Sequence, residues 1–326
     1  MTGSTPSAAR FPWWTSCLPR PSIGRLDSNS TCRRNTSTFA IGYIAGPHAG
    51  ERLKSWTEAS NQPMFDSLAA YLQAALISRR SDRQQCLNHI GIAVVEVEGR
   101  RLVSAVLDNS PAFRAGLRRG DRIISVNGGP FHPVYSFNPR PPAAPEPDRQ
   151  VFRLAFSRGG AEQEVAVTPV FNNLFDSYRN AVEASVQQFN VGNKVIGYVR
   201  LWGISRNAND LVVLQRIMAD LRTTSSLIVD LRNAAGYLDR EHLALFLPGD
   251  FGDYYSSPLA LIIDRSTSGP AEAFARELSP LERVTSVGST TAGGLQPELR
   301  ADWPLNSTSA NDPQFEAALG LLAGLI

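Results

Sequence analysis

A serine lies at the junction between an apolar strand and a helix. The stretch Leu259–Arg265 has the sequence LALIIDR, which is typical of a buried strand, and Pro270 is placed where the next helix would begin. Ser268 and Gly269 then lie at the positive end of that helix, where developing negative charge is stabilised. These residues could support nucleophilic acyl transfer, with backbone amides binding the oxyanion. A serine that only caps the helix would give the same pattern.

A nucleophilic serine needs a base, and the sequence restricts which residue can be that base. Lysine occurs only at Lys54 and Lys194, and Lys194 precedes a strand that is remote in sequence from Ser268. A Ser–Lys dyad is therefore not expected, and in a catalytic chain the general base must be a histidine. The chain has four histidines, which are His48, His89, His132 and His242.

The bulk composition excludes several classes of function. The chain has 326 residues, of which 43% are hydrophobic, so it can bury a sizeable core in two or three domains. A net charge of +2 gives no reason to expect nucleic acid or an anionic membrane as a partner. The three cysteines (Cys17, Cys32 and Cys86) predict neither a disulfide framework nor a zinc site, and no apolar run could span a bilayer. We therefore expect no cofactor, no metal and no transmembrane segment.

One block in the first half of the chain carries a dense pattern of fixed positions. Leu102–Gly128 has the sequence LVSAVLDNSPAFRAGLRRGDRIISVNG, which predicts a strand over Leu102–Leu107, a short helix opened by Ser110 and Pro111, and a second strand over Arg122–Val126. The block resembles the PDZ domains of bacterial type. The resemblance implies a domain that binds extended peptides, often at a free C-terminal carboxylate, as an added strand at a sheet edge.

The patterns along the chain predict five segments. Residues 1–40 indicate a disordered tail or a processed leader, and 41–87 an N-terminal helical region with a helix over Met64–Arg79. A PDZ-like peptide-binding domain follows over 88–170, in which the proline-rich stretch Asn138–Pro147 is expected to be a loop. Residues 171–193 are expected to form a connecting helix. Strands and helices alternate over 194–326, which predicts an α/β domain with a parallel sheet.

Four motifs in the last segment follow one another in the order seen in a peptidase family. They are GYVRLW (Gly197–Trp202), LIVDLRNAAG (Leu227–Gly236), LIIDRSTSGPAEAFA (Leu261–Ala275) and VGSTTAGG (Val287–Gly294). The series resembles the C-terminal processing, or tail-specific, peptidases, whose relatives include the tricorn core and the retinoid-binding repeats. From about His89 onward, the resemblance implies a serine peptidase on a crotonase/Clp-like α/β fold with an inserted PDZ-like domain.

The resemblance also assigns roles to particular residues. It implies an oxyanion hole formed by the amides of Gly236, in the turn after the DLR motif, and Gly269. Ser268 would be the nucleophile, and His89, which lies where the tricorn-like relatives keep their histidine, would be the base. Glu272, one turn into the helix, would orient the base or only complement the helix dipole. A histidine at a strand entry with no catalytic task would explain His89 equally well.

The chain departs from the family pattern at three points. Counted back from Glu272, the family's nucleophile position falls on Gly269, and a one-residue gap is needed to give that role to Ser268. Gly294 stands where the processing peptidases have their lysine. The DLR turn ends in Ala235–Tyr237, with a single glycine where two are usual.

Two functions from different classes fit these observations. The leading hypothesis is a serine-type peptidase whose PDZ-like domain recruits the C-termini of protein or peptide substrates. The alternative is a catalytically inactive pseudo-peptidase that acts as a peptide-binding module, as the three departures favour. A carrier of small apolar ligands, like the retinoid-binding relatives, is a third hypothesis. Relatives generally work outside the cytoplasm, which is the only indication of a compartment.

Overall fold

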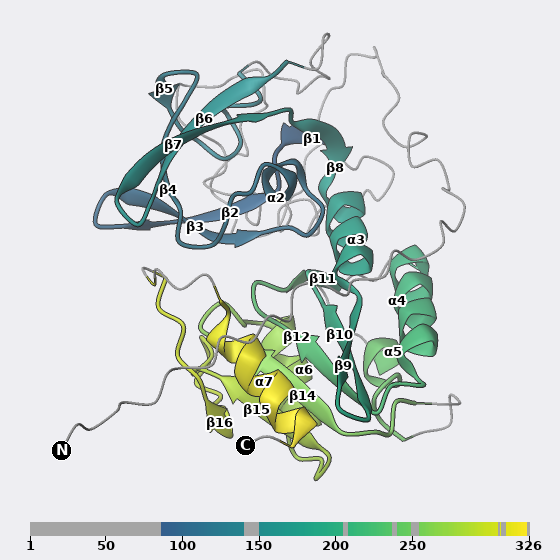
Figure 1. Ribbon diagram of the computed structural model, residues 1–326. Coiled ribbons are helices and arrows are strands. Elements are labelled where there is room, and N and C mark those ends of the chain that lie inside the picture. The colour runs from purple at the N-terminus through teal and green to yellow at the C-terminus, as the bar shows by residue number, and fades with distance from the viewer. Residues whose placement is uncertain are drawn as a thin grey trace, which may run out of the picture. The chain divides into compact units, whose positions relative to one another are not determined.

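The computed structural model describes residues 86–139, 150–204, 208–236, 240–248, 254–305, 307 and 311–324. The expected tail over 1–40 and the expected helix over Met64–Arg79 lie outside the described residues, as does most of the proline-rich loop. The described chain contains two six-stranded sheets, one antiparallel and one mostly parallel, and helix α3 lies between them in sequence (Figure 1).

The antiparallel sheet contains the block from Leu102 to Gly128. Its path is β2-β3-β4-β6-β7, and β5 pairs with β4. A short helix, α2, begins after Ser110, whose Oγ accepts a hydrogen bond from the amide of Phe113 at 3.2 Å, as the Ser-Pro pattern predicts. The elements are β2 (Ile92–Val97), β3 (Arg100–Val106), α2 (Pro111–Arg114), β4 (Arg122–Val126), β5 (Gly129–Pro130), β6 (Phe152–Arg158) and β7 (Ala161–Val167).

A separate two-stranded ladder brings together the residues on either side of the antiparallel sheet. β1 (Cys86–His89) pairs antiparallel with β8 (Val170–Asn173), so that His89 lies opposite Val170. Cys86 at the start of β1 is disulfide-bonded, although the number and spacing of the cysteines predict no disulfide framework. The three cysteines showed no pairing pattern in the sequence, because a disulfide depends on which segments meet in the fold.

The second sheet has the strand order β16-β15-β14-β12-β10-β9, in which all neighbours are parallel except β9 and β10. A small parallel pair, β11 with β13, follows the ends of β10 and β12. The strands are β9 (Gln187–Val191), β10 (Lys194–Arg200), β11 (Gly203–Ile204), β12 (Ser226–Asp230), β13 (Ala235–Gly236), β14 (Leu259–Ile263), β15 (Val284–Gly288) and β16 (Leu299–Arg300). The helices are α3 (Leu174–Ser185), α4 (Ala208–Leu221), α5 (Arg240–Leu243), α6 (Pro270–Leu278) and α7 (Pro313–Ala323).

The expected connecting helix over 171–193 is only partly present. Its first residues belong to β8 and its last to β9, and α3 occupies only the middle of the range. The stretch Gln187–Val191 alternates in exposure, and the two residues Gly192 and Asn193 form a hairpin turn into β10. Gly192 has a φ of 61°, a conformation that favours glycine. The Gly-Asn turn was the signal for a strand here, and tertiary pairing with β10 decided the conformation.

The parallel sheet is covered on both faces, which explains why its strands are continuously apolar. Ile228 and Ile262 belong to one buried cluster with residues of α7, which lies across the strands in Figure 1. Their sequence neighbours Val229 and Leu261 belong to the cluster on the other face, with residues of α3, α4 and α6. The sheet therefore holds the carboxyl ends of β10, β12 and β14 firmly at one edge.

The packing of the segment between β1 and β2 against the N-cap of α2 can be tested at Gly91. Gly91 and Gly116 both have φ of +79°, but a Cβ on Gly91 would lie 2.4 Å from the Cβ of Ser110, whereas a Cβ on Gly116 would meet no atom within 4 Å. We expect Gly116→Ala to lower the free energy of unfolding by about 1–2 kcal/mol, the cost of left-handed backbone. Gly91→Ala should lower the free energy of unfolding by about 1–3 kcal/mol more than Gly116→Ala does, because the added Cβ overpacks against Ser110. Equal losses in urea unfolding of the two variants would contradict the close contact with Ser110.

Candidate active site

The start of α6 has the backbone geometry of a sharp strand-to-helix turn. Gly269 is the N-cap residue of α6, with φ 53° and ψ −124°, and a Cβ at this position would meet no atom within 4 Å. A turn of this strained kind holds the nucleophilic serine in many hydrolases. Here the residue in the strained conformation is a glycine, and Ser268 precedes it as an exposed residue. Gly269 is therefore both the nucleophile position counted back from Glu272 and the residue with the strained backbone.

The loop between β14 and α6 is fixed by side chains that the sequence analysis did not assign to the site. Asp264 accepts hydrogen bonds from the amide and the hydroxyl of Ser266. The Ser266 Oγ accepts a bond from the amide of Asn233 at 2.9 Å, and the buried Thr267 hydroxyl lies 3.3 Å from the carbonyl oxygen of Leu231. The only sequence signal for these roles was a run of hydroxyl residues after a strand.

The two predicted oxyanion residues follow adjacent strands of the sheet. β12 and β14 pair in parallel, and the bonds just described join the loops that leave them. Gly236 lies in β13, opposite Ile204, and the amide of the preceding Ala235 donates to the carbonyl of Trp202 at 3.0 Å. The structure thus brings the segments carrying Gly236 and Gly269 to one edge of the sheet, where open α/β sheets bind their ligands.

Glu272 is committed to the loop after β15 rather than to a base. It is 6% exposed, its Oε1 accepts from Arg276 at 2.6 Å, and its Oε2 accepts from the amide of Gly293 at 2.8 Å. Burial raises the pKa of the Glu272 carboxyl, but hydrogen bonds from Arg276, Gly293 and Thr291 outweigh burial and leave this pKa below its ordinary value. A Cβ on Gly293 would lie 2.5 Å from Glu272 Oε1, so the glycine gives the carboxylate its room.

His89 is buried and contacts a different serine from the one predicted. Its side chain is 1% exposed, and Nε2 lies 2.9 Å from the Oγ of Ser177 in α3. Asn172 donates a hydrogen bond to the same Ser177 oxygen at 3.3 Å, and His89 Nδ1 has no partner among the described residues. Burial lowers the pKa of His89 to about 4, which makes the imidazole a weak base. No described hydrogen bond joins His89 to Ser268, so the predicted pair is absent from this structure.

The remaining candidate bases are also held in other contacts. The His132 Nδ1 accepts hydrogen bonds from the amides of Val134 and Tyr135, and His242 is buried on α5. Lys194 donates to the carbonyl oxygens of Leu322 and Ala323 and so caps the end of α7. His48 lies outside the described residues.

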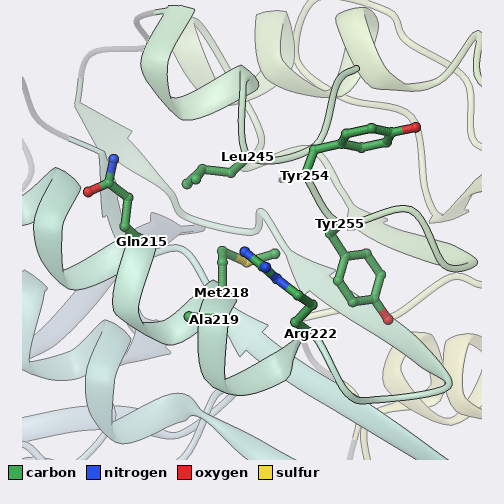
Figure 2. Close-up of a pocket in the computed structure, with 7 residues that line it drawn as sticks. All are labelled: Gln215, Met218, Ala219, Arg222, Leu245, Tyr254 and Tyr255. Carbon is green, nitrogen blue, oxygen red and sulfur yellow. The ribbon is translucent and has the colours of Figure 1, made fainter. Parts of the chain in front are cut away.

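A cavity of about 240 Å³ lies away from these residues, beside α4 (Figure 2). None of the predicted site residues lines it. Figure 2 shows one side formed by α4 and the other by the turn after α5 and the segment that enters β14. Its lining consists of Gln215, Met218, Ala219, Arg222, Leu245, Tyr254 and Tyr255.

The described residues contain no group of three or more His, Cys, Asp or Glu side chains placed to hold a metal ion. Each helix in the described part of the chain is too short or too polar to cross a membrane.

The comparison with known families identifies the antiparallel sheet. The family profile of the PDZ domain matches residues 102–134, which include β4, α2 and most of β3. A search of curated proteins finds no match to the sequence.

The comparison with solved structures identifies the fold. A candidate S41 protease from Bacteroides fragilis superposes with a TM-score of 0.51 at 16% identity, over 82% of this chain and 93% of that protein. The chain has the fold of the S41 peptidases. The photosystem II D1 C-terminal processing protease is also similar, with a TM-score of 0.45 at 16% identity, over 80% of its length and 78% of this chain. The tricorn protease gives a TM-score of 0.38 at 15% identity, over 76% of this chain and 30% of its own.

The PDZ match agrees with the resemblance of the block Leu102–Gly128, and the superposed fold agrees with the fold that the four motifs imply. The PDZ domain is confirmed. The mixed α/β sheet has the arrangement of the S41 fold. The similar proteins named above are peptidases.

The role of Glu272 as an anchor of the Gly293 loop can be tested by truncation. We expect Glu272→Ala to lower the free energy of unfolding by about 1–3 kcal/mol, since it leaves the amide of Gly293 without its acceptor. Glu277→Ala, on an exposed position of the same helix, is the control and should change stability by less than about 0.5 kcal/mol. Urea unfolding of both variants measures the difference. Similar losses in the two variants would show that Glu272 does not anchor the loop.

Burial of His89 predicts a specific loss of stability in acid. As the pH falls from 6.5 toward 4, the unfolded chain takes up a proton that the folded chain excludes, so folding is destabilised over this window. His89→Gln should remove this contribution, which amounts to about 2–3 kcal/mol between pH 7 and pH 4. Urea unfolding of the wild type and the variant at several pH values measures it. Ser177→Ala keeps the buried imidazole, so this variant should still lose stability as the pH falls. Parallel pH curves for the wild type and His89→Gln would contradict a depressed pKa.

Proposed function

We propose that this chain is a peptide-binding protein on an S41 peptidase fold that does not cleave its ligands by the serine mechanism. The observation that carries the proposal is the glycine in the strained N-cap position of α6. At Gly269 the backbone has φ 53° and ψ −124°, and the direction of a side chain is open. A nucleophilic side chain at this position would have room, and the amides at the start of α6 would lie beside it. Glycine supplies no such side chain.

The candidate bases support the same proposal. His89 bonds to Ser177, and its pKa of about 4 makes proton uptake from a serine unfavourable at neutral pH. Gly294 occupies the family's lysine position, with a φ of +89°. The two positions on which the processing peptidases depend therefore both carry glycine.

The proposed ligands are peptides or protein segments with free C-termini, bound through the PDZ domain. β2 is an edge strand of the antiparallel sheet, and an edge strand can receive an extended peptide as an additional strand. Two apolar side chains of β2 are exposed, Val95 at 40% and Val97 at 43%. They would supply apolar contacts for such a peptide.

The finer architecture is also part of the proposal. We assign residues 88–170 to the PDZ-like domain and 194–326 to a crotonase/Clp-like α/β domain. The parallel order of β10, β12, β14 and β15 supports the second assignment.

A serine peptidase with Ser268 as nucleophile is the second candidate function. It is favoured by the exposure of Ser268 at the start of α6 and by the proximity of the loop to β13. In this second candidate function, a one-residue shift of the alignment makes Ser268 the nucleophile. Gly269 and Gly236 then donate their amides to the oxyanion.

Labelling by a fluorophosphonate probe, combined with peptide binding, distinguishes the two functions. The folded wild-type chain is expected to remain unlabelled, because no described base contacts Ser268. It should bind a pool of random peptides with free C-termini more strongly than the same pool with amidated C-termini, because amidation removes the carboxylate.

Ser268→Ala is the matched control and should bind the free peptides as the wild type does. Labelling of the wild type that is lost in Ser268→Ala would overturn the proposal and establish the peptidase. Equal and negligible binding of the two peptide pools by unlabelled, folded protein would also overturn it.

A further inference from the structure

The cavity beside α4 lies toward the amino edge of the parallel sheet, whereas Gly269 follows the carboxyl end of β14 (Figure 2). Two of its lining residues come shortly before a strand begins: Arg222 precedes β12, and Tyr255 precedes β14. Each of these strands has five residues, so about 17 Å separate this edge from the carboxyl edge. The cavity is therefore distinct from the candidate active site.

Hydrogen bonds fix the wall of the cavity that faces α4. The amide of Tyr255 donates to the carbonyl of Leu245 at 2.8 Å, which joins the segment entering β14 to the turn after α5. Arg283 ties the same two segments together, because its guanidinium donates to the carbonyl oxygens of Phe246 and Ser257. This wall is thus held in place by contacts within the protein.

A second set of contacts joins this wall to the end of α4. The Tyr255 hydroxyl lies 3.1 Å from the Thr224 Oγ1, which donates to the carbonyl of Leu221, the last residue of α4, at 2.7 Å. Ala219 contributes only a methyl group to the lining (Figure 2). Because the two walls are fixed and one lining side chain is small, the cavity is already formed without a ligand.

The lining is apolar at its base and polar at its rim. Met218 and Tyr255 are 5% and 3% exposed, whereas Gln215 and Arg222 are exposed. A methionine sulfur and a tyrosine ring both make favourable contacts with another aromatic ring. The amide and guanidinium groups at the rim are hydrogen-bond donors. This arrangement suits a ligand with an aromatic body and an acceptor group at one end.

The charge and the size of the cavity narrow the class of ligand. Arg222 is the one charged side chain among the seven lining residues, and the guanidinium of Arg283 lies 5.8 Å from the centre of the Tyr254 ring in the lining. Guanidinium groups bind carboxylates through paired N–H bonds. A volume of about 240 Å³ corresponds to about eight water molecules. It accommodates one aromatic ring with a carboxylate and is too small for a long acyl chain.

We propose that this cavity binds a small aromatic carboxylate. The ring lies against Met218 and Tyr255, and the carboxylate accepts hydrogen bonds from Arg222 and Gln215. The site goes beyond the proposed function and does not depend on it, because it uses no residue of the PDZ domain or of the loop before α6.

Methionine methyl NMR of the full chain gives a direct test with benzoate. The chain has three methionines, Met1, Met64 and Met218, and Met218→Leu, which nearly conserves side-chain volume, identifies the methyl signal from the cavity. Benzoate at about 10 mM would nearly fill a site with a Kd of about 1 mM, so its ring should shift the Met218 signal. An unchanged Met218 signal in folded protein would overturn the proposal.

Benzamide is the matched ligand control. It keeps the ring and nearly the same size, but its uncharged amide replaces the carboxylate. Its Kd, measured from the titration of the Met218 signal, should be weaker by about tenfold or more, because the charge-assisted hydrogen bonds are lost. Equal affinity for benzoate and benzamide would overturn the assignment of the ligand as an anion.

Three variants test the parts of the site. Arg222→Met should weaken benzoate binding by about tenfold or more. Arg216→Met removes the same charge from an exposed position of α4 outside the lining, so it should leave the Kd unchanged. Ala219→Leu should fill the cavity and abolish the shift caused by benzoate. A wild-type Kd in Arg222→Met or Ala219→Leu, or an equal loss in Arg216→Met, would overturn the proposal.

Discussion

The carboxyl edge of the parallel sheet depends on one buried carboxylate, that of Asp230. Arg232 donates to it from both its backbone amide and its guanidinium, and the Tyr198 hydroxyl donates to it at 3.0 Å. Burial raises the pKa of Asp230, but the charges of Arg232 and Arg200 outweigh burial and hold the pKa at about 2. Removing one partner of such a buried pair typically costs about 3–5 kcal/mol. The turn after β12 must therefore fold so that Arg232 returns to the strand it has just left.

The same arginine fixes the position of α7. It pairs with Asp312 at 2.6 Å and with Gln314 Oε1 at 3.0 Å, and Asp312 in turn accepts the first amides of α7. α7 then covers one face of the sheet and completes its apolar core. One ion-pair network thus directs the turn toward Gly236 and holds the helix that buries the strands, which links the edge of the sheet to its stability.

The sequence was sufficient for the parts of this structure that depend on local pattern. The apolar run Leu259–Arg265 predicted β14, Pro270 marked the first residue of α6, and the Ser-Pro pattern predicted the cap of α2. The sequence did not reveal the partner of His89, which depends on how α3 packs, or the strand β9, which depends on pairing with β10. The commitment of Glu272 to Gly293 was likewise hidden, since 21 residues separate the carboxylate from the amide it accepts. The contacts of His89 and Glu272 join segments that are distant in sequence, whereas β9 pairs with its neighbour β10 through the Gly192–Asn193 turn.

Glycine at position 269 relieves the backbone strain that a serine would carry in the same conformation. A serine held at φ 53° and ψ −124° carries backbone strain of about 1–3 kcal/mol, which is retained where catalysis requires it. Glycine adopts this conformation at little cost, so the turn keeps its shape and its helix-end amides when the hydroxyl is absent. Gly293, by contrast, is still required as a glycine, because Glu272 fills the space of its Cβ. The turn therefore keeps its backbone conformation and its helix-end amides, while the strained position carries no side chain that could act as a nucleophile.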